Sequence, residues 1–347
     1  MTAFWTFLAC LSGLFLPEIQ PVPTDQIDAL MAKYEGKVPG ASVLVVRDGK
    51  AVVSRSYGFA DLENNVKAAP STNYRLASVT KQFTAAAILL LAQDRKLSLD
   101  DKVKRWLPSL PPALDSVTIT QLLSHTSGII DYEDVIPPGT TTQVHDADVL
   151  ALLQSQDSTY FKPGTKYQYS NSGYSLLALI VQKASGKTFA TFLHDRIFAP
   201  LGMKNTVAFE DGVSIAANRA YGYTMKDSAW TRKDQSVTSA VLGDGGIYSS
   251  IDDMQKWDAA LYDSRLLSDS SRKLAFSSHT PTDNPEISYG FGWRITGETL
   301  WHSGETSGFR NVIVRWPARK LTVVILTNRD APGPYETALK IGELSGS

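Results

Sequence analysis

The amino-acid sequence predicts an α+β fold in which one β-sheet is built from both ends of the chain and a helical region is inserted between them. Two observations support this prediction: strand-like segments cluster near the two termini, and the middle of the chain has helical periodicity. A third is that no internal repeat, low-complexity segment or long linker interrupts the chain. At 347 residues, with 43% hydrophobic and 20% charged residues, the chain can bury one large core or two linked cores.

Each predicted element has a local reason. Apolar residues at helical spacing predict a first helix that begins at Thr24 and ends at Gly36. Two strand-like segments around Asp48-Gly49 predict a hairpin, because that dipeptide favours a tight turn. The predicted strands are 41–46, 51–57, 290–295, 299–304, 311–316 and 321–327, and the other predicted helices are 78–94, 121–125, 147–154, 175–183, 188–198, 252–261 and 335–344. Segments 131–139 and 221–235 are expected to be surface loops that either border the functional site or only connect elements.

The pattern Ser78-Val79-Thr80-Lys81 stands at the start of the most apolar predicted helix. A helix that is apolar on all sides is buried, so Ser78 and Lys81 are expected one turn apart on one face of a central helix. Burial in a cleft is expected to lower the pKa of Lys81, which would then accept the proton of a nucleophilic Ser78. The free N–H groups at the start of the helix would stabilise developing negative charge. The alternative is that Ser78 is only an N-cap.

The same spacing occurs a second time, at Ser270 and Lys273. A four-residue pattern of this kind is expected by chance about once in a chain of this length. Since the second copy lies in a polar segment beside Arg272, we interpret it as a solvated helix end.

Two scarcer patterns follow later in the chain. Among fourteen tyrosines only Tyr169 has an asparagine, Asn171, two residues later, and among five histidines only His302 has a glycine, Gly304, two residues later. Taken alone, Tyr169 could be a packing residue with its hydroxyl bonded to the backbone, and His302 could be a structural or surface histidine. Because they occur in this order after the first Ser-x-x-Lys pattern, they predict a site for acyl transfer with a nucleophile, a base and a proton relay.

In these patterns the chain resembles the penicillin-recognising serine hydrolases, specifically the group of class C β-lactamases, DD-peptidases and family VIII esterases. The resemblance runs from about residue 25 to the end, and further similar stretches are 122–128 (Leu-Leu-Ser-His-Thr-Ser-Gly), 200–203, 245–249 and 289–293. It implies an antiparallel sheet flanked by N- and C-terminal helices, a large inserted all-α lobe, and an active site between the two. We therefore expect a hydrolase domain at 21–347, with an α/β part at about 24–72 and 285–347 and a helical lobe at about 73–284.

The resemblance also implies the roles of the catalytic residues. Ser78 would be the nucleophile that forms an acyl-enzyme, and Lys81 would be its proton acceptor. Tyr169 would carry the proton to the leaving group and later help to activate the hydrolytic water. The backbone N–H groups of Ser78 and Glu305 would form the oxyanion hole.

Four residues are implied to bind the substrate. Asn171 would point its amide at a substrate carbonyl, and Ser303 would offer a hydroxyl. Gly304 has no side chain, which would let a substrate lie along the strand edge. His302 stands where class C β-lactamases carry the lysine of Lys-Thr-Gly, and histidine is mostly neutral at pH 7. A substrate carboxylate is less well matched by a neutral group, so esterase and D-amino-acid peptidase activities are expected ahead of β-lactamase activity.

The first seventeen residues are almost wholly apolar, and residues 1–20 are predicted to contain an export signal, although no basic residue precedes the apolar run. We expect an extracytoplasmic protein, periplasmic or secreted, and a cytoplasmic one if the run is not a working signal. The run is too short to predict a transmembrane helix. Cys10 is the single cysteine, so the mature domain is expected to have no disulfide.

The composition argues against nucleic acid, metal ions and cofactors as partners, and it leaves three functional classes open. With a net charge of −1, the chain lacks the excess of positive charge that is typical of nucleic-acid-binding proteins. No Cys/His cluster has metal-ligand spacing and no Gly-rich phosphate loop follows a strand, so we expect no metal and no cofactor. The expected partner is a small-molecule or peptide substrate, without nucleic acid and without a stable membrane span. Besides a serine hydrolase, the sequence allows a penicillin-binding or sensor protein that is acylated without efficient turnover, and an inactive scaffold.

Overall fold

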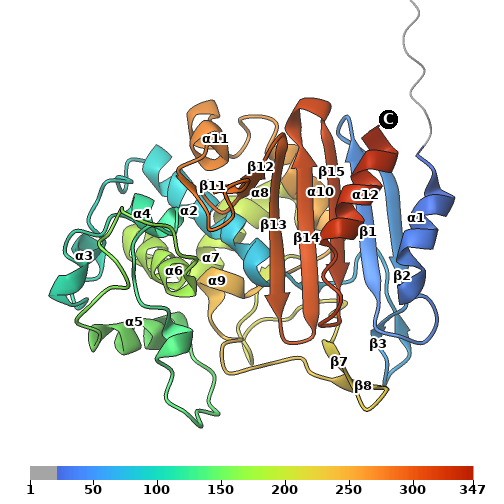
Figure 1. Ribbon diagram of the computed structural model, residues 1–347, viewed down its shortest axis with the longest axis horizontal. Helices are drawn as coiled ribbons and strands as arrows, with labels where there is room; N and C mark the ends of the chain where they lie inside the picture. Colours follow the sequence, from blue (N-terminus) through green and yellow to red (C-terminus); the bar gives the residue numbers. More distant parts are fainter. Residues whose placement is uncertain (1–21, 347) are drawn as a thin grey trace, which may run out of the picture.

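The largest element of the fold is an eight-stranded antiparallel sheet that takes its strands from both ends of the chain (Figure 1). The computed structural model describes residues 22–346. The order across the sheet is β10-β11-β12-β13-β14-β15-β1-β2. These strands are β1 (Ala41–Arg47), β2 (Lys50–Tyr57), β10 (Thr280–Pro281), β11 (Ser288–Tyr289), β12 (Arg294–Thr296), β13 (Thr299–Thr306), β14 (Phe309–Trp316) and β15 (Leu321–Thr327). The predicted α+β fold class, with one sheet built from both termini, is confirmed.

Helices α1 (Thr24–Met31) and α12 (Tyr335–Gly346) pack on one face of this sheet (Figure 1). Side chains alternate between the faces of a strand, so Val43 and Val45 of β1 pack with these two helices. Leu44 and Val46 point to the opposite face and join the larger core beneath the helical region. Because both faces are covered, β1 and β15 are buried along nearly their whole length and read as continuous apolar runs.

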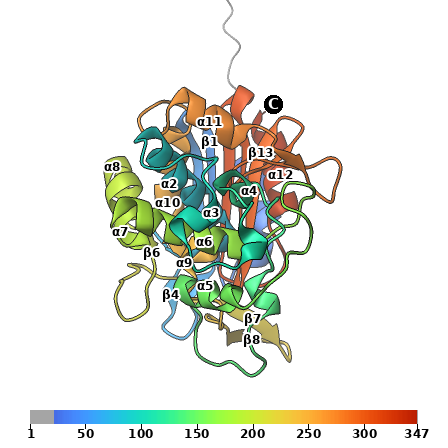
Figure 2. The ribbon, with the colours of Figure 1, turned by 90° about the vertical axis from the view of Figure 1, so that its left-hand side faces the viewer.

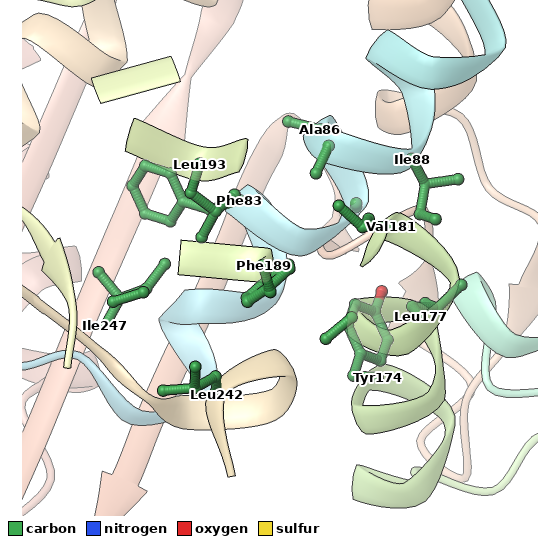
Figure 3. Packing of buried hydrophobic residues seen from close by; sticks show 14 of the residues in the cluster. Phe83, Ala86, Ile88, Tyr174, Leu177, Val181, Phe189, Leu193, Leu242 and Ile247 are labelled. Atoms are coloured by element: carbon green, nitrogen blue, oxygen red, sulfur yellow. The ribbon is translucent and has the colours of Figure 1, made fainter. Parts of the chain in front are cut away.

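The central helix α2 (Lys81–Gln93) connects the sheet with the helical region (Figure 2). Its residues from Lys81 to Leu91 are all buried, as the sequence predicts. Figure 3 shows Phe83 and Ile88 of α2 among side chains from α6 (Asn171–Ser185) and α7 (Phe189–Leu193). The remaining helices are α3 (Val103–Trp106), α4 (Ile119–Leu123), α5 (Asp146–Gln154), α8 (Ala199–Leu201), α9 (Leu242–Gly245), α10 (Ile251–Ala260) and α11 (Asp269–Phe276). The boundaries expected between the two parts of the hydrolase domain, near residues 72 and 285, stay predictions.

Three small sheets complete the described part of the fold. A three-stranded sheet joins β5 (Tyr74–Arg75), β9 (Ile247–Ser249) and β6 (Val207–Ala208), and a two-stranded one joins β3 (Phe59–Asp61) and β4 (Val66–Lys67). Strands β7 (Tyr223–Lys226) and β8 (Ala229–Arg232) form a hairpin within segment 221–235, so the expectation of a plain loop there is wrong. None of the helices between residues 22 and 346 has the length and apolar character needed to cross a bilayer. The predicted export signal and Cys10 lie outside the described residues.

The predicted strand 290–295 is wrong over most of its length. Only its last two residues belong to β12, and the segment before them bends between β11 and β12. Gly292 has a φ of +77°, and a Cβ atom at this position would lie 2.7 Å from the backbone oxygen of Lys81. The bend therefore packs directly against the start of α2, which the alternation of residues in the sequence could not reveal.

Candidate active site

A polar hollow opens between the start of α2, the start of α6, helix α9 and the end of β13. Ser78, Asn171 and Glu305 all line it, although they are far apart in the sequence. Asp244 and Thr306 line it as well. The structure thus brings one residue from each of the three sequence patterns, or its direct neighbour, to a single surface.

Ser78 lies in a short 3-10 turn, Ala77–Thr80, that runs directly into α2. Residues three apart eclipse one another in such a turn, so Lys81 is placed directly beside Ser78. The Nζ atom of Lys81 lies 3.1 Å from Ser78 Oγ. No cap hydrogen bond from the Ser78 side chain is present at the start of α2, so the N-cap interpretation is not supported. Ala77 adopts a left-handed φ of +50°, a costly conformation for a residue with a side chain, immediately before Ser78.

The ammonium group of Lys81 is fully buried and lies among three acceptors. Besides Ser78 Oγ, these are Asn171 Oδ1 at 2.8 Å and the backbone oxygen of Asp244 at 3.0 Å. Across residues 22–346, no carboxylate lies within ion-pair distance of Lys81. The lysine is therefore held in place by neutral oxygens, at hydrogen-bond distance from the serine that it would deprotonate.

Asn171 is the first residue of α6 and links Lys81 to two acidic side chains. Its Oδ1 accepts from Lys81, its Nδ2 donates to Glu133 Oε1 at 3.1 Å, and its backbone N–H donates to Asp131 Oδ2 at 2.7 Å. The amide that was expected to point at a substrate carbonyl is thus engaged by protein groups at both ends. Asp131 and Glu133 were not predicted as site residues, although the segment 131–139 was expected to border the site or to connect elements.

Tyr169 precedes α6 and presents the face of its ring to Lys81. The Nζ atom of Lys81 lies 4.8 Å from the ring centroid, within the range of a cation–π contact. The next residue, Ser170, caps α6 by accepting a hydrogen bond from the N–H of Gly173 at 3.2 Å. The hydroxyl of Tyr169 is buried and has no hydrogen-bond partner among the residues that the structure describes. The backbone bond that the packing interpretation expects is therefore not seen among these residues, and the catalytic role of Tyr169 stays a prediction.

His302 lies on β13 but does not reach the hollow. Its side chain is buried, its Nε2 lies 2.9 Å from the Tyr289 hydroxyl, and its Nδ1 lies 2.6 Å from the backbone oxygen of Ser303. Burial, followed by the positive charges of Arg294 and Lys81, lowers the pKa of His302 well below its usual value. The ring is therefore neutral, with Nδ1 donating to the carbonyl and Nε2 accepting from Tyr289. The structure thus gives His302 no positive charge to offer a substrate carboxylate.

Gly304 is needed for a reason beyond the one expected. A Cβ atom at this position would lie 2.0 Å from the backbone oxygen of Leu76. The space on the side of the missing Cβ is thus filled by the segment before Ser78. The expectation that a substrate lies along this strand edge stays a prediction. On the neighbouring strand, Asn311 donates to the backbone oxygen of Arg75 at 2.7 Å and holds the same segment. Ser303, beside Gly304 on β13, is half-buried.

Burial raises the pKa of two carboxyl groups that line the hollow, those of Asp244 and Glu133. Burial raises the pKa of Asp244 to about 7, while the charge of Lys81 acts in the opposite direction. The hydroxyl of Tyr132 donates to Asp244 Oδ2 at 3.0 Å. Burial, followed by the nearby charge of Asp131, also raises the pKa of Glu133. Within the described part of the chain, no group of three or more His, Cys, Asp and Glu side chains is arranged to hold a metal ion.

The second Ser-x-x-Lys pattern lies on α11, away from the hollow. Ser270 and Lys273 are both exposed, and Ser270 Oγ lies 2.9 Å from the hydroxyl of Ser268 at the helix start. The interpretation of this copy as a solvated helix end agrees with this position.

The chain is similar to known proteins over most of its length. A family model described as Beta-lactamase matches residues 24–345. Penicillin-binding protein 4* from Bacillus subtilis (strain 168) is 32% identical over 317 residues, which are 86% of this chain and 70% of that protein. The protein flp from Staphylococcus aureus (strain MW2) is 31% identical over 320 residues, and this chain spans 62% of its length. The crystal structure of a penicillin-binding protein from Bacillus halodurans is 27% identical, with a TM-score of 0.80 over 92% of this chain and 98% of that chain.

Proposed function

Because this chain belongs to the beta-lactamase family of serine hydrolases, we propose that it cleaves an ester or an amide through an acyl-enzyme formed on Ser78. One observation carries the proposal: Lys81 Nζ lies 3.1 Å from Ser78 Oγ at the edge of a solvent-accessible hollow. A nucleophile and a base at this distance, held by fixed partners, are what acyl transfer requires.

In the proposed reaction, Lys81 takes the proton of Ser78 as Oγ bonds to the substrate carbonyl carbon. The backbone N–H groups of Ser78 and Glu305, two residues that line the hollow, would stabilise the negative charge that develops on the carbonyl oxygen. As the bond to the leaving group breaks, the proton passes from Lys81 through Tyr169 to the leaving group. Water then attacks the acyl-enzyme, and its proton passes through the Tyr169 hydroxyl to the neutral amine of Lys81. Lys81 returns this proton to Ser78 Oγ as the bond between Oγ and the acyl carbon breaks.

The contacts of Asn171 support a revised role for this residue. It bonds Lys81 on one side and Glu133 on the other, which suits a residue that orients the base. Its Nδ2 carries a second N–H, which could donate to a substrate carbonyl while the contacts with Lys81 and Glu133 are kept. We therefore propose that Asn171 orients Lys81 and can also bind the substrate.

The surroundings of His302 support a substrate that has no obligatory carboxylate. A permanent cation at this strand would suit the carboxylate of a β-lactam, whereas His302 is neutral and already bonded on both ring nitrogens. We propose esterase or D-amino-acid peptidase activity, with Ser303 and the backbone at Gly304 along the substrate, ahead of β-lactamase activity.

A second function is favoured by the relatives. Two of them are named penicillin-binding proteins, which favours the alternative that this chain is acylated by penicillin without efficient turnover. The apolar residues at the start of the sequence favour export, so we propose an extracytoplasmic location for either function.

Steady-state hydrolysis of p-nitrophenyl esters, D-amino-acid p-nitroanilides and a chromogenic cephalosporin tests the proposal. Turnover of an ester or an anilide by the wild type, lost in Ser78→Ala and kept in the matched control Ser270→Ala, is the expected result. A single burst of product without turnover would favour the penicillin-binding alternative. Turnover that survives Ser78→Ala would contradict the assignment of the nucleophile.

A further inference from the structure

His125 is a buried histidine in the stretch 122–128 that the mechanism above leaves without a task. It follows α4, only 1% of its surface is exposed, and its φ is +58°. This left-handed conformation is uncommon for a residue with a side chain and persists only where the surrounding structure enforces it. The conformation allows the backbone and the side chain of His125 to bind the same neighbouring segment.

That segment is the one that carries Tyr169. The backbone oxygen of His125 accepts from the N–H of Gln168 at 2.9 Å, and His125 Nδ1 accepts from the N–H of Ser170 at 3.1 Å. One residue thus bonds the chain on both sides of Tyr169. In addition, the rings of His125 and Tyr169 lie 4.4 Å apart between centroids with an interplanar angle of 35°.

Other tyrosines surround the remaining sides of the imidazole. The ring centroids of Tyr289, Tyr174 and Tyr167 lie 4.6, 5.1 and 5.9 Å from that of His125. Tyr174 is itself fixed, because its hydroxyl donates to the backbone oxygen of Leu123 at 2.8 Å. The Nε2 atom of His125 has no hydrogen-bond partner in the part of the chain that the structure describes.

The charge state of His125 suits its bond to Ser170. Burial, followed by the positive charge of Lys81, lowers the pKa of His125 well below its usual value. In the neutral ring Nδ1 accepts, and the proton is on Nε2. A protonated Nδ1 could not accept from the N–H of Ser170, so the neutral form is the one that holds the segment.

We propose that His125 is a positioning residue that holds Tyr169 beside Lys81 through its hydrogen bonds to Gln168 and Ser170. The inference rests on the proposed role of Tyr169 in protonating the leaving group. His125 touches neither the nucleophile nor the hollow, and it acts only through the tyrosine. Loss of its Nδ1 contact would let the Tyr169 segment move relative to Lys81, and proton delivery would suffer more than the attack by Ser78.

Three variants and two esters of one acid test this proposal. His125→Asn keeps an acceptor near the position of Nδ1, His125→Gly removes it, and both residues tolerate a positive φ. Tyr169→Phe is the reference. The esters share an acyl group and differ in the leaving group, p-nitrophenolate or ethoxide, because only ethoxide needs a proton as it leaves. Labelling of Ser78 by a fluorophosphonate, whose fluoride leaves without a proton, reports on the nucleophile alone.

We expect Tyr169→Phe and His125→Gly to lower kcat/KM for the ethyl ester by on the order of ten- to a hundredfold more than for the p-nitrophenyl ester. His125→Asn is expected to recover most of this selective loss, and fluorophosphonate labelling is expected to stay close to the wild-type rate in all three. Combining His125→Gly with Tyr169→Phe should cause no further selective loss, since both act on one step.

Two results would overturn the positioning role while leaving Tyr169 in place. One is a selective loss in Tyr169→Phe with none in His125→Gly, and the other is a His125→Asn variant as impaired as His125→Gly. If Tyr169→Phe itself has no selective loss, the proposed role of Tyr169 fails, and the inference fails with it. His125→Ala replaces His125→Gly in the same measurements should the glycine variant not fold.

Discussion

Lys81 Nζ lies 2.8 Å from Asn171 Oδ1, closer than the 3.1 Å that separates it from Ser78 Oγ. Helix α2 begins with the lysine and helix α6 begins with the asparagine, so the contact joins the starts of the two helices. The nitrogen of the same amide donates to Glu133, which fixes the orientation of the amide. Asn171 therefore controls both the position and the charge environment of the proposed base.

Asn171→Asp tests this control. A carboxylate at the position of Oδ1 would form an ion pair with the ammonium of Lys81, and a lysine held in this charged form cannot take the proton of Ser78. We predict that kcat/KM at pH 7 falls by about tenfold or more, as expected for the loss of a general base. Asn171→Ala is the control, because it removes the contact without adding charge. Equal kcat/KM at pH 7 for Asn171→Asp and wild type would contradict the assignment of Lys81 as base.

Gly304→Ala tests the contact between β13 and the segment before Ser78. The added methyl group would lie 2.0 Å from the Leu76 backbone oxygen, so the strand or the segment must shift. We predict a loss of about 1–3 kcal/mol in the free energy of unfolding, together with reduced turnover, because Ser78 follows directly after this segment. Gly333→Ala is the matched control, since no atom lies within 4 Å of a Cβ there and its φ is not positive. Equal urea midpoints and equal turnover for the two variants would contradict this prediction.

His302→Gln tests the neutral state of the buried histidine. The pKa of His302 is lowered in the folded protein, so the unfolded chain binds the proton more tightly. The contribution of this residue to stability is therefore complete above about pH 6.5 and is lost as the pH falls below that value. We predict that wild type loses up to about 1.4 kcal/mol per pH unit more than His302→Gln between pH 6.5 and 5. Urea unfolding at several pH values measures this difference, and parallel curves would show that His302 is not held neutral.

Asp244→Asn tests a buried acid, for which the free energy of unfolding should depend on pH in the direction opposite to that of His302. Burial raises the pKa of Asp244 to about 7, so the folded protein binds the proton more tightly than the unfolded chain. Wild-type stability should therefore fall as the pH rises from about 4 to 7, because the carboxyl must ionise while buried. The amide of the variant can still accept from the Tyr132 hydroxyl, so the variant should lack this part of the pH dependence. An unchanged dependence in the same urea experiment would contradict the assignment.

The sequence predicted the larger features because they follow from local patterns. The continuous apolar runs of β1 and β15 and the longer apolar segment after Lys81 are each recognisable from their length and composition. The strand expected at 290–295 failed because Gly292 meets the backbone of Lys81, a contact between segments that are distant in the chain. Local propensity cannot report such contacts.

The same limit explains what was missed in the site. The sequence placed Ser78, Lys81 and Asn171 in one cleft but could not show that both ring nitrogens of His302 are occupied inside the protein. Glu133 belongs to a segment whose only signal was a loop-like composition. His125 stood in a stretch noted for its resemblance alone, and its bonds to both neighbours of Tyr169 became evident only from the fold.

Intact-protein mass spectrometry after mixing with an ester substrate tests the central claim most directly. Samples of the wild type, Ser78→Ala and Ser270→Ala would be quenched in acid within the first turnovers. We predict that the wild type and Ser270→Ala gain the mass of one acyl group, that the modified peptide contains Ser78, and that Ser78→Ala gains nothing. Either of two results would contradict the acyl-enzyme mechanism. One is an acyl adduct on Ser78→Ala, and the other is a wild type that hydrolyses the ester while its Ser78 peptide never gains the acyl mass.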